Sequence, residues 1–164
     1  MKKILFVVAL LFAGGCAQTE PTRYQIFGIN KFRQIKANPK RHAGELYAFG
    51  GRAANVEHTQ DGVRFELLVQ SRLAGTGERL PTDDPLTVVY RGGDTTVADG
   101  HQVKVLGYVG RPVVGENVFG VKVSSFSLDA IAVYDAFTQY SFSLSGYEEM
   151  FEKWKTGEPL GTKN

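Results

Sequence analysis

The sequence contains only one cysteine, Cys16, so no disulfide can form within the chain. A domain without a crosslink must be held together by its hydrophobic core alone. The same absence excludes a zinc site built from several thiolates, which needs more than one cysteine.

Motifs for catalysis and metal binding are also missing. The histidines His42, His58 and His101 are scattered and form no HxH or HExxH spacing, so a zinc site has no support. No GxSxG elbow and no GxGxxG or GxxxxGK[ST] loop occurs,. Solvated side chains are a simpler interpretation of the adjacent Asp83 and Asp84 than calcium binding or glycoside hydrolysis. We therefore expect a protein that is not an enzyme and binds no metal.

Long hydrophobic runs are absent beyond the N-terminus. Lys2 and Lys3 precede an apolar segment at residues 4–12, which is much shorter than the ~20 apolar residues of a membrane-spanning helix. A positive start followed by an apolar run of this length is typical of a secretory signal peptide. We therefore expect export.

The segment that follows resembles a bacterial lipobox. Gly14 and Gly15 supply the small residues before Cys16, and Ala13 stands where the family usually has leucine. The resemblance implies that residues 1–15 are a lipoprotein signal peptide and that Cys16 carries a covalent lipid, with no other cofactor. Several acyl chains anchor stably, since each buried methylene contributes ~0.8 kcal/mol. An ordinary signal peptide ending in a free thiol is the alternative.

The residue after the cysteine indicates a destination. In bacterial lipoproteins an aspartate at this position favours retention in the inner membrane, and this chain has Ala17 there. The resemblance therefore implies an anchor in the outer membrane, with the protein facing the periplasm. We expect residues 16–24 to form a lipidated tether and residues 25–164 to form a single domain.

The mature chain has no excess of either charge. The signal peptide contains two lysines, so its removal lowers Lys+Arg from 19 to 17, which equals the 17 Asp+Glu. General affinity for nucleic acid requires an excess of cationic groups that displace counterions from phosphates. We therefore expect partners in the envelope, either a protein or a glycan, and no nucleic acid.

Cationic residues gather early in the domain, with no acidic residue between them. They are Lys31, Arg33, Lys36, Lys40 and Arg41. The simpler interpretation is a solvated helix face. The alternative is contact with anionic lipid headgroups or lipopolysaccharide phosphates, since the tether would hold this face near the membrane.

Hydrophobic periodicity predicts a helix followed by strands. Apolar residues at 29, 32 and 35 indicate a short helix that ends before Pro39,. From Gly44 the period becomes two, with a bulge or bend at Gly50-Gly51 and a hairpin at residues 61–62. The expected strands are 45–57, 63–70, 86–90, 101–109 and one or two within 117–134, broken near 124–125, with a loop at 71–85 and a turn at 111–115.

About five strands without intervening helices predict an all-β protein. A small closed antiparallel barrel is favoured, because closure removes exposed sheet edges. A long first strand bent at its glycines fits an OB-like barrel, whereas an eight-stranded lipocalin would need more strands. Such barrels bind oligomers across strands 2 and 3. The expected outward residues there (Arg64, Glu66, Leu68 and Gln70) include one base and no aromatic ring, a weak platform for nucleic acid,.

Residues 145–156 predict a C-terminal amphipathic helix. Ser145 and Glu148 have the spacing of a capping box, and Gly157 is placed to end the helix,. One face of this helix contains Tyr147, Met150, Phe151 and Trp154. We expect this face to pack on the barrel wall or close one mouth of the barrel; binding of a partner is the alternative.

Several short motifs resemble the starvation-inducible outer-membrane lipoprotein family, Slp. They are Asn38-Pro39, Gly44, Phe49-Gly50-Gly51, Asn55-Val56 and Phe65-Glu66. Family members carry a lipobox and the pattern P-x4-G-x4-F-G-G, found here at residues 39–51. The similarity covers residues 38–69 and, more weakly, 101–134, and it fails over 71–100. The resemblance implies an envelope lipoprotein with an OB-like barrel and no established enzymatic activity.

These observations favour a lipid-anchored outer-membrane protein that acts as a structural or interaction module. The alternative is an OB-type binding module for an envelope glycan or small ligand. An exposed tyrosine or tryptophan beside an arginine in a groove would favour the alternative, and a filled barrel with a flat apolar patch would favour the first function.

Overall fold

The computed structural model describes residue 24 and residues 26–72, 79–116 and 122–160, with side chains described except at 71–84 and 113–124. The elements, in chain order, are α1 (Ile29–Ala37), η1 (Pro39–His42), β1 (Leu46–Thr59), β2 (Gly62–Arg72), β3 (Arg79–Tyr90), β4 (Gln102–Glu116), β5 (Lys122–Asp135), β6 (Tyr140–Ser143) and α2 (Glu148–Thr156). Within these ranges, no helix has both the length and the apolar character needed to cross a membrane.

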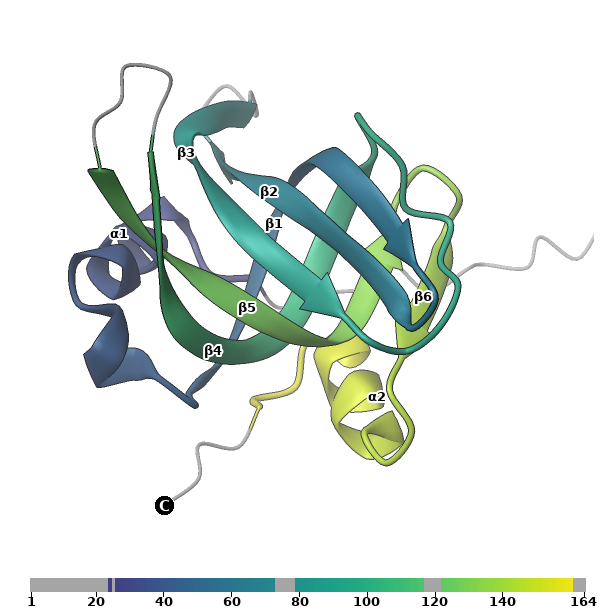
Figure 1. Cartoon of the computed structure of the whole chain (residues 1–164). Helices are drawn as coiled ribbons and strands as arrows, with labels where there is room; N and C mark the ends of the chain where they lie inside the picture. The colour runs from purple at the N-terminus through teal and green to yellow at the C-terminus, as the bar shows by residue number, and fades with distance from the viewer. Residues whose placement is uncertain (1–23, 25, 73–78, 117–121, 161–164) are drawn as a thin grey trace, which may run out of the picture.

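The strands form one sheet that closes on itself (Figure 1). Their order is β3-β2-β1-β4-β5-β6, and β3 also pairs with β5. β1 to β5 therefore make a closed barrel, and β6 extends the sheet beside β5. The predicted five-stranded OB-like barrel is confirmed. It is not wholly antiparallel, because residues 87–90 of β3 pair in parallel with residues 127–130 of β5.

Apolar side chains from all five barrel strands fill the interior. The period-two pattern correctly predicts the buried residues of β2, which are Val63, Phe65, Leu67 and Val69. The predicted N-terminal helix is α1, and its buried residues Phe32 and Ile35 join the same core. The Phe32 ring lies 5.9 Å from that of Phe49 and 5.7 Å from that of Phe126. α1 therefore plugs the end of the barrel at which β1 begins.

A second apolar layer lies outside the barrel, where α2 covers a wall made by β1, β4 and β5 (Figure 1). Trp154 is 0% exposed and packs with Ala48, Leu106 and Ala132. Tyr24, which precedes α1 in the chain, also packs in this layer. α2 packs as the first interpretation predicts.

The start of α2 differs from the predicted capping box. The helix begins at Glu148, and Tyr147 occupies the N-cap without a side-chain capping bond. The Glu148 carboxylate accepts a hydrogen bond from the Gly146 backbone N–H at 3.0 Å, so Ser145 does not cap the helix. Gly157 ends the helix in a left-handed conformation (φ 79°), as predicted,.

The glycine pair of β1 marks a close backbone approach and not a bulge. The pairing of β1 with β4 runs without a shift through residues 46–52. A Cβ at Gly51 would lie 2.2 Å from the Leu68 carbonyl oxygen of β2, so a larger residue would force the two strands apart. The bulge lies between Ala54 and Glu57.

The predicted loop at residues 71–85 is largely strand. β2 continues to Arg72, and β3 begins at Arg79. Their pairing includes a register shift between Leu68 and Gln70. Pro81 and Pro85 flank the shift on the opposing strand. Irregular pairing accommodates proline, which has no N–H to donate, so prolines here do not indicate a loop.

The predicted turn at 111–115 and break at 124–125 are also wrong. β4 runs through the first segment to Glu116, with a register shift between Val109 and Pro112. β5 is continuous through the second, and the Ser125 hydroxyl donates a hydrogen bond to the Pro85 carbonyl at 3.2 Å. The four-residue β6 is too short for the sequence pattern to predict it.

Packing of α2 predicts a large effect of one substitution. We expect Trp154→Ala to lower the free energy of unfolding by about 3–5 kcal/mol, because it leaves a cavity in a packed layer. Glu152→Ala, at an exposed position of the same helix, should change it by less than about 0.5 kcal/mol. Urea denaturation followed by circular dichroism measures both. Equal effects of the two substitutions would contradict this packing.

Candidate functional site

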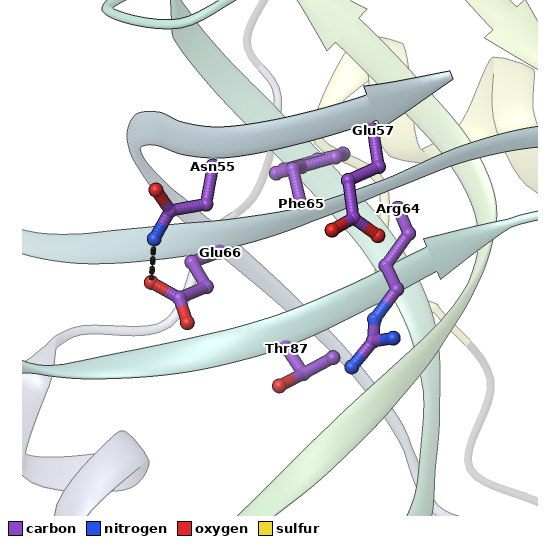
Figure 2. A pocket seen from close by; sticks show the side chains of 6 residues that line it. All are labelled: Asn55, Glu57, Arg64, Phe65, Glu66 and Thr87. Carbon is purple, nitrogen blue, oxygen red and sulfur yellow. Dashed lines mark hydrogen bonds between the residues drawn. The ribbon is translucent and has the colours of Figure 1, made fainter. Parts of the chain in front are cut away.

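A polar hollow of about 100 Å³ lies on the outer face of β1, β2 and β3 (Figure 2). Because alternate residues of β2 point into the barrel, the intervening Arg64 and Glu66 point outward,. The lining residues are Asn55, Glu57, Arg64, Phe65, Glu66 and Thr87. The hollow thus occupies the face that the OB-like fold predicts for ligands.

The bulge in β1 directs one lining residue into the hollow. Asn55 has a φ of 51°, a left-handed conformation that asparagine adopts more readily than most residues. Its side-chain Nδ2 donates a hydrogen bond to Glu66 Oε2 at 2.7 Å (Figure 2). The bond joins β1 to β2 across the floor of the hollow.

Opposite charges face each other at the other end of the hollow. Glu57 of β1 is the register partner of Arg64 of β2. Figure 2 shows the Arg64 side chain extending toward Thr87 of β3. Among the residues that the structure describes, neither Glu57 nor Arg64 has a hydrogen-bond or ion-pair partner for its charged group. Both groups are therefore available to a ligand.

The chemistry of the hollow suits a small neutral polar ligand. Two carboxylates outnumber one guanidinium, so the site repels phosphate groups. Phe65 is only 1% exposed and offers no ring for a base or sugar to stack upon. The amide of Asn55, the hydroxyl of Thr87 and the charged groups together can donate to and accept from ligand hydroxyl and amide groups.

The structure brings the predicted basic residues together at one end of the barrel. α1 carries Lys31, Arg33 and Lys36, and η1 carries Lys40 and Arg41. Arg33, Lys40 and Arg41 are exposed, whereas the other two are half-buried. Lys31 Nζ lies 5.4 Å from the centre of the Tyr47 ring, within range of a cation–π interaction. Contact with headgroups stays a prediction.

A polar cluster joins η1 to β1 beside these residues. Tyr47 donates its hydroxyl proton to Glu45, and His42 Nδ1 lies 2.8 Å from Glu45 Oε2. Burial and the bond to Glu45 raise the pKa of Tyr47 to about 12. The bonds from Tyr47 and His42 lower the pKa of Glu45. Tyr47 therefore stays protonated at neutral pH and can donate its proton to Glu45.

A second cluster, which the sequence pattern does not predict, surrounds Asp135 at the other end of the barrel. Asp135 is 0% exposed. Its carboxylate accepts hydrogen bonds at 2.9 Å from His101 Nδ1, Thr96 Oγ1 and the Phe137 backbone N–H. Burial raises the pKa of Asp135, and these bonds outweigh it, so the pKa lies below its usual value. The cluster ties the β5–β6 turn to the loop before β4.

Each of the three histidines contacts a different partner. His42 contacts Glu45, His58 contacts the Val97 carbonyl at 2.9 Å, and His101 contacts Asp135. In the described part of the chain, no group of three or more histidine, cysteine or acidic residues is arranged to hold a metal ion.

Two further predictions concern the remaining candidate residues. The face proposed for a partner contains Tyr147, Met150, Phe151 and Trp154, and all four pack in the layer between α2 and the barrel. Trp154 is wholly buried, whereas Tyr147, Met150 and Phe151 are only partly buried, so binding of a partner through this face stays a prediction. Cys16 lies outside the described residues, as do the side chains of Asp83 and Asp84.

Comparison with known proteins identifies a similarity of fold only at low level. A solved structure, the small single-stranded DNA-binding protein from Streptomyces coelicolor, aligns with 19% identity and a TM-score of 0.42. The alignment covers 59% of this chain and 98% of that chain. No protein-family profile and no curated protein matches the sequence. Similarity at this level does not extend to function.

Asp135 predicts a pH-dependent contribution to stability. Its pKa is lower in the folded state, so its contribution is complete above the unfolded-state pKa of about 3.9 and is lost as pH falls through the folded-state value. We expect Asp135→Asn to lower the free energy of unfolding by about 1.5–3 kcal/mol at pH 7, because hydrogen bonds to a buried charge are lost. The difference from wild type should shrink in acid.

Urea denaturation of both proteins between neutral and acid pH measures this difference directly. Taking the difference removes the contribution of the other carboxylates, which titrate in both proteins. A constant difference across the range would show that the Asp135 carboxylate is not stabilised by its donors.

Proposed function

We propose that this chain is an outer-membrane lipoprotein, anchored through a lipid on Cys16, that acts as a non-enzymatic interaction module of the bacterial envelope. The observation that carries the proposal is that the barrel interior is filled by its own side chains, with α1 closing one end. A filled barrel leaves binding to its outer surface. The lipobox and the resemblance to the Slp family support the anchor and its compartment.

The docking of Tyr24 supports a short connection between anchor and domain. The Tyr24 ring lies 4.6 Å from each of the rings of Tyr134 and Trp154, and its hydroxyl is 3.0 Å from Ser141 Oγ. Cys16 is eight residues earlier in the chain, a distance of at most ~28 Å when fully extended. A lipid on Cys16 would therefore keep the barrel close to the membrane surface.

The state of the titratable clusters supports a role without catalysis. Asp135 is enclosed by its donors and has no exposed surface, so a substrate cannot reach it. Tyr47 keeps its proton, with a pKa of about 12. Each cluster joins two backbone segments, which is a structural task.

Exposed aromatic side chains offer a contact for an envelope protein. Phe137, on the β5–β6 turn, and Tyr140, at the start of β6, are 75% and 62% exposed. Exposed aromatic rings are enriched at protein contacts. They provide an exposed apolar element that is not part of α2.

Metabolic labelling with a palmitate analogue and membrane fractionation test the anchor. We expect the wild type to carry label in the outer membrane and Cys16→Ser to lose it, because the thiol is the acceptor. Ala17→Asp should keep the label and move the protein to the inner membrane. Absence of label in the wild type, with free periplasmic protein in both cases, would overturn the proposal.

The hollow supports a second candidate function, the binding of an envelope glycan or small polar ligand. Glu57 and Arg64 face each other, and neither charged group has a partner among the described residues, while Asn55 lies at the bulge. Pairs of groups that are fixed by strands and not satisfied within the protein are suited to a ligand. The absence of an exposed ring among the lining residues makes this function secondary to the first.

Titration with a soluble N-acetylglucosamine oligosaccharide, monitored by amide NMR shifts, tests this second function. We expect shifts that saturate and map to residues 55–57, 64–66 and 87. Arg64→Ala should weaken binding about tenfold or more, since a charged hydrogen bond contributes roughly 1.5–3 kcal/mol. Arg91→Ala, an exposed arginine outside the hollow, is the matched control. No saturable shift at these residues would exclude this ligand class.

A further inference from the structure

The two ends of the barrel carry opposite charge, although the mature chain has none overall. At the end closed by α1, the described residues 26–50 include five cations and one acid, Glu45. At the opposite end, the β1–β2 hairpin and the loop before β4 expose four acids, Glu57, Asp61, Asp94 and Asp99, against two cations, Arg64 and Arg91. Figure 1 shows α1 on one side of the barrel and these loops on the other.

The basic end is built on rigid elements. Phe32 and Ile35 are buried in the core, so helical geometry places Arg33 on the outside of α1. The Gly44 N–H bonds to the Val109 carbonyl at 2.8 Å, and the Val109 N–H bonds to the Glu45 carbonyl at 2.9 Å. These bonds fix the chain that follows η1 against β4. Arg33, Lys40 and Arg41 are exposed from this fixed base.

The one described acid among these cations does not neutralise all of them. Glu45 contacts Tyr47 and His42 and interacts electrostatically with Lys31, whereas Arg33, Lys40 and Arg41 are exposed. The ion pairs that involve acids elsewhere, such as Arg91 with Asp129 at 3.4 Å and Lys153 with Glu149 at 2.6 Å, use other cations. The described acids therefore leave a positive field in front of α1 and η1.

We propose that the end of the barrel formed by α1 and η1 lies against anionic phospholipid headgroups of the membrane that holds the anchor. This orientation rests on the proposed function, because only a tethered barrel remains within reach of the surface. Each lysine or arginine near an anionic surface strengthens binding by about fivefold. The acidic end is repelled by the same surface, so both ends favour one orientation.

Vesicle binding by the mature chain carrying Cys16→Ser tests the surface without the lipid. The vesicles contain either phosphatidylcholine alone or equal parts of phosphatidylcholine and phosphatidylglycerol. We expect sedimentation with the anionic vesicles only, weakening as salt is added, because salt screens exposed charges. The triple variant Arg33→Gln, Lys40→Gln and Arg41→Gln should lower the affinity roughly 100-fold, since three contributions are removed.

A control triple variant, Arg52→Gln, Lys153→Gln and Lys155→Gln, removes the same charge from other surfaces. It should retain anionic binding within about threefold, because long-range effects of exposed charges are screened. Circular dichroism of each variant checks that it is folded. Equal losses in the two triple variants would overturn the proposal by showing that net charge alone matters.

The vesicle and labelling experiments separate the two proposals. If the Cys16→Ser chain does not prefer anionic vesicles, the proposed contact with headgroups is wrong, whatever the labelling shows. If the chain binds anionic vesicles but the wild type carries no lipid label, the headgroup contact is supported and the lipid anchor is contradicted. In that case the basic end would serve a periplasmic protein that associates with the membrane through charge.

Discussion

The parallel pairing between β3 and β5 closes the barrel and thereby determines which side chains face the core and which face outward. Without the pairing of residues 87–90 with residues 127–130, the sheet would be an open ribbon with two free edges,. Closure assigns an inner and an outer side to every strand, because side chains alternate. Phe65 therefore enters the core, while Arg64 and Glu66 face outward beside the hollow. The wall that α2 covers follows from the same alternation in β1, β4 and β5.

The two ends of the barrel are closed by different chemistry. At one end, Phe32 of α1 fills the opening with apolar packing and leaves the polar side of the helix in solvent. At the other end, β5 continues beyond the residues that pair with β3 and ends at Asp135. The Asp135 carboxylate accepts hydrogen bonds from Thr96 and His101. Apolar closure leaves Arg33 of α1 and Lys40 and Arg41 of η1 exposed, whereas polar closure holds His101 against Asp135.

Local patterns in the sequence predict the fold well, and tertiary pairings account for what they miss. The alternation from Val63 to Val69 predicts the buried side of β2, and the spacing of Phe32 and Ile35 predicts α1. The prolines at 81 and 85 make a strand look like a loop in the sequence. The register shift that accommodates them arises only from the pairing with β2.

The candidate site illustrates the same limit. Arg64 and Glu66 are identifiable as outward residues from their own strand, but Asn55 and Thr87 join them only through pairing in the barrel. His101 and Asp135 are 34 residues apart, and no spacing rule connects them. The net charge of the chain also does not reveal that the two ends of the barrel differ in charge, because the opposite charges cancel in the sum.

Tether length and charge would have separate roles in an anchored protein. A connection of eight residues permits many orientations, because its reach of ~28 Å is comparable to the size of a small barrel. It cannot choose which end approaches the bilayer. Electrostatic contacts are weak singly but add over Arg33, Lys40 and Arg41, and the tether raises their effective concentration,. The lipid would thus supply affinity and the basic end would supply orientation, which places the β1–β2 hairpin and the exposed Phe137 away from the membrane, where a partner can reach them.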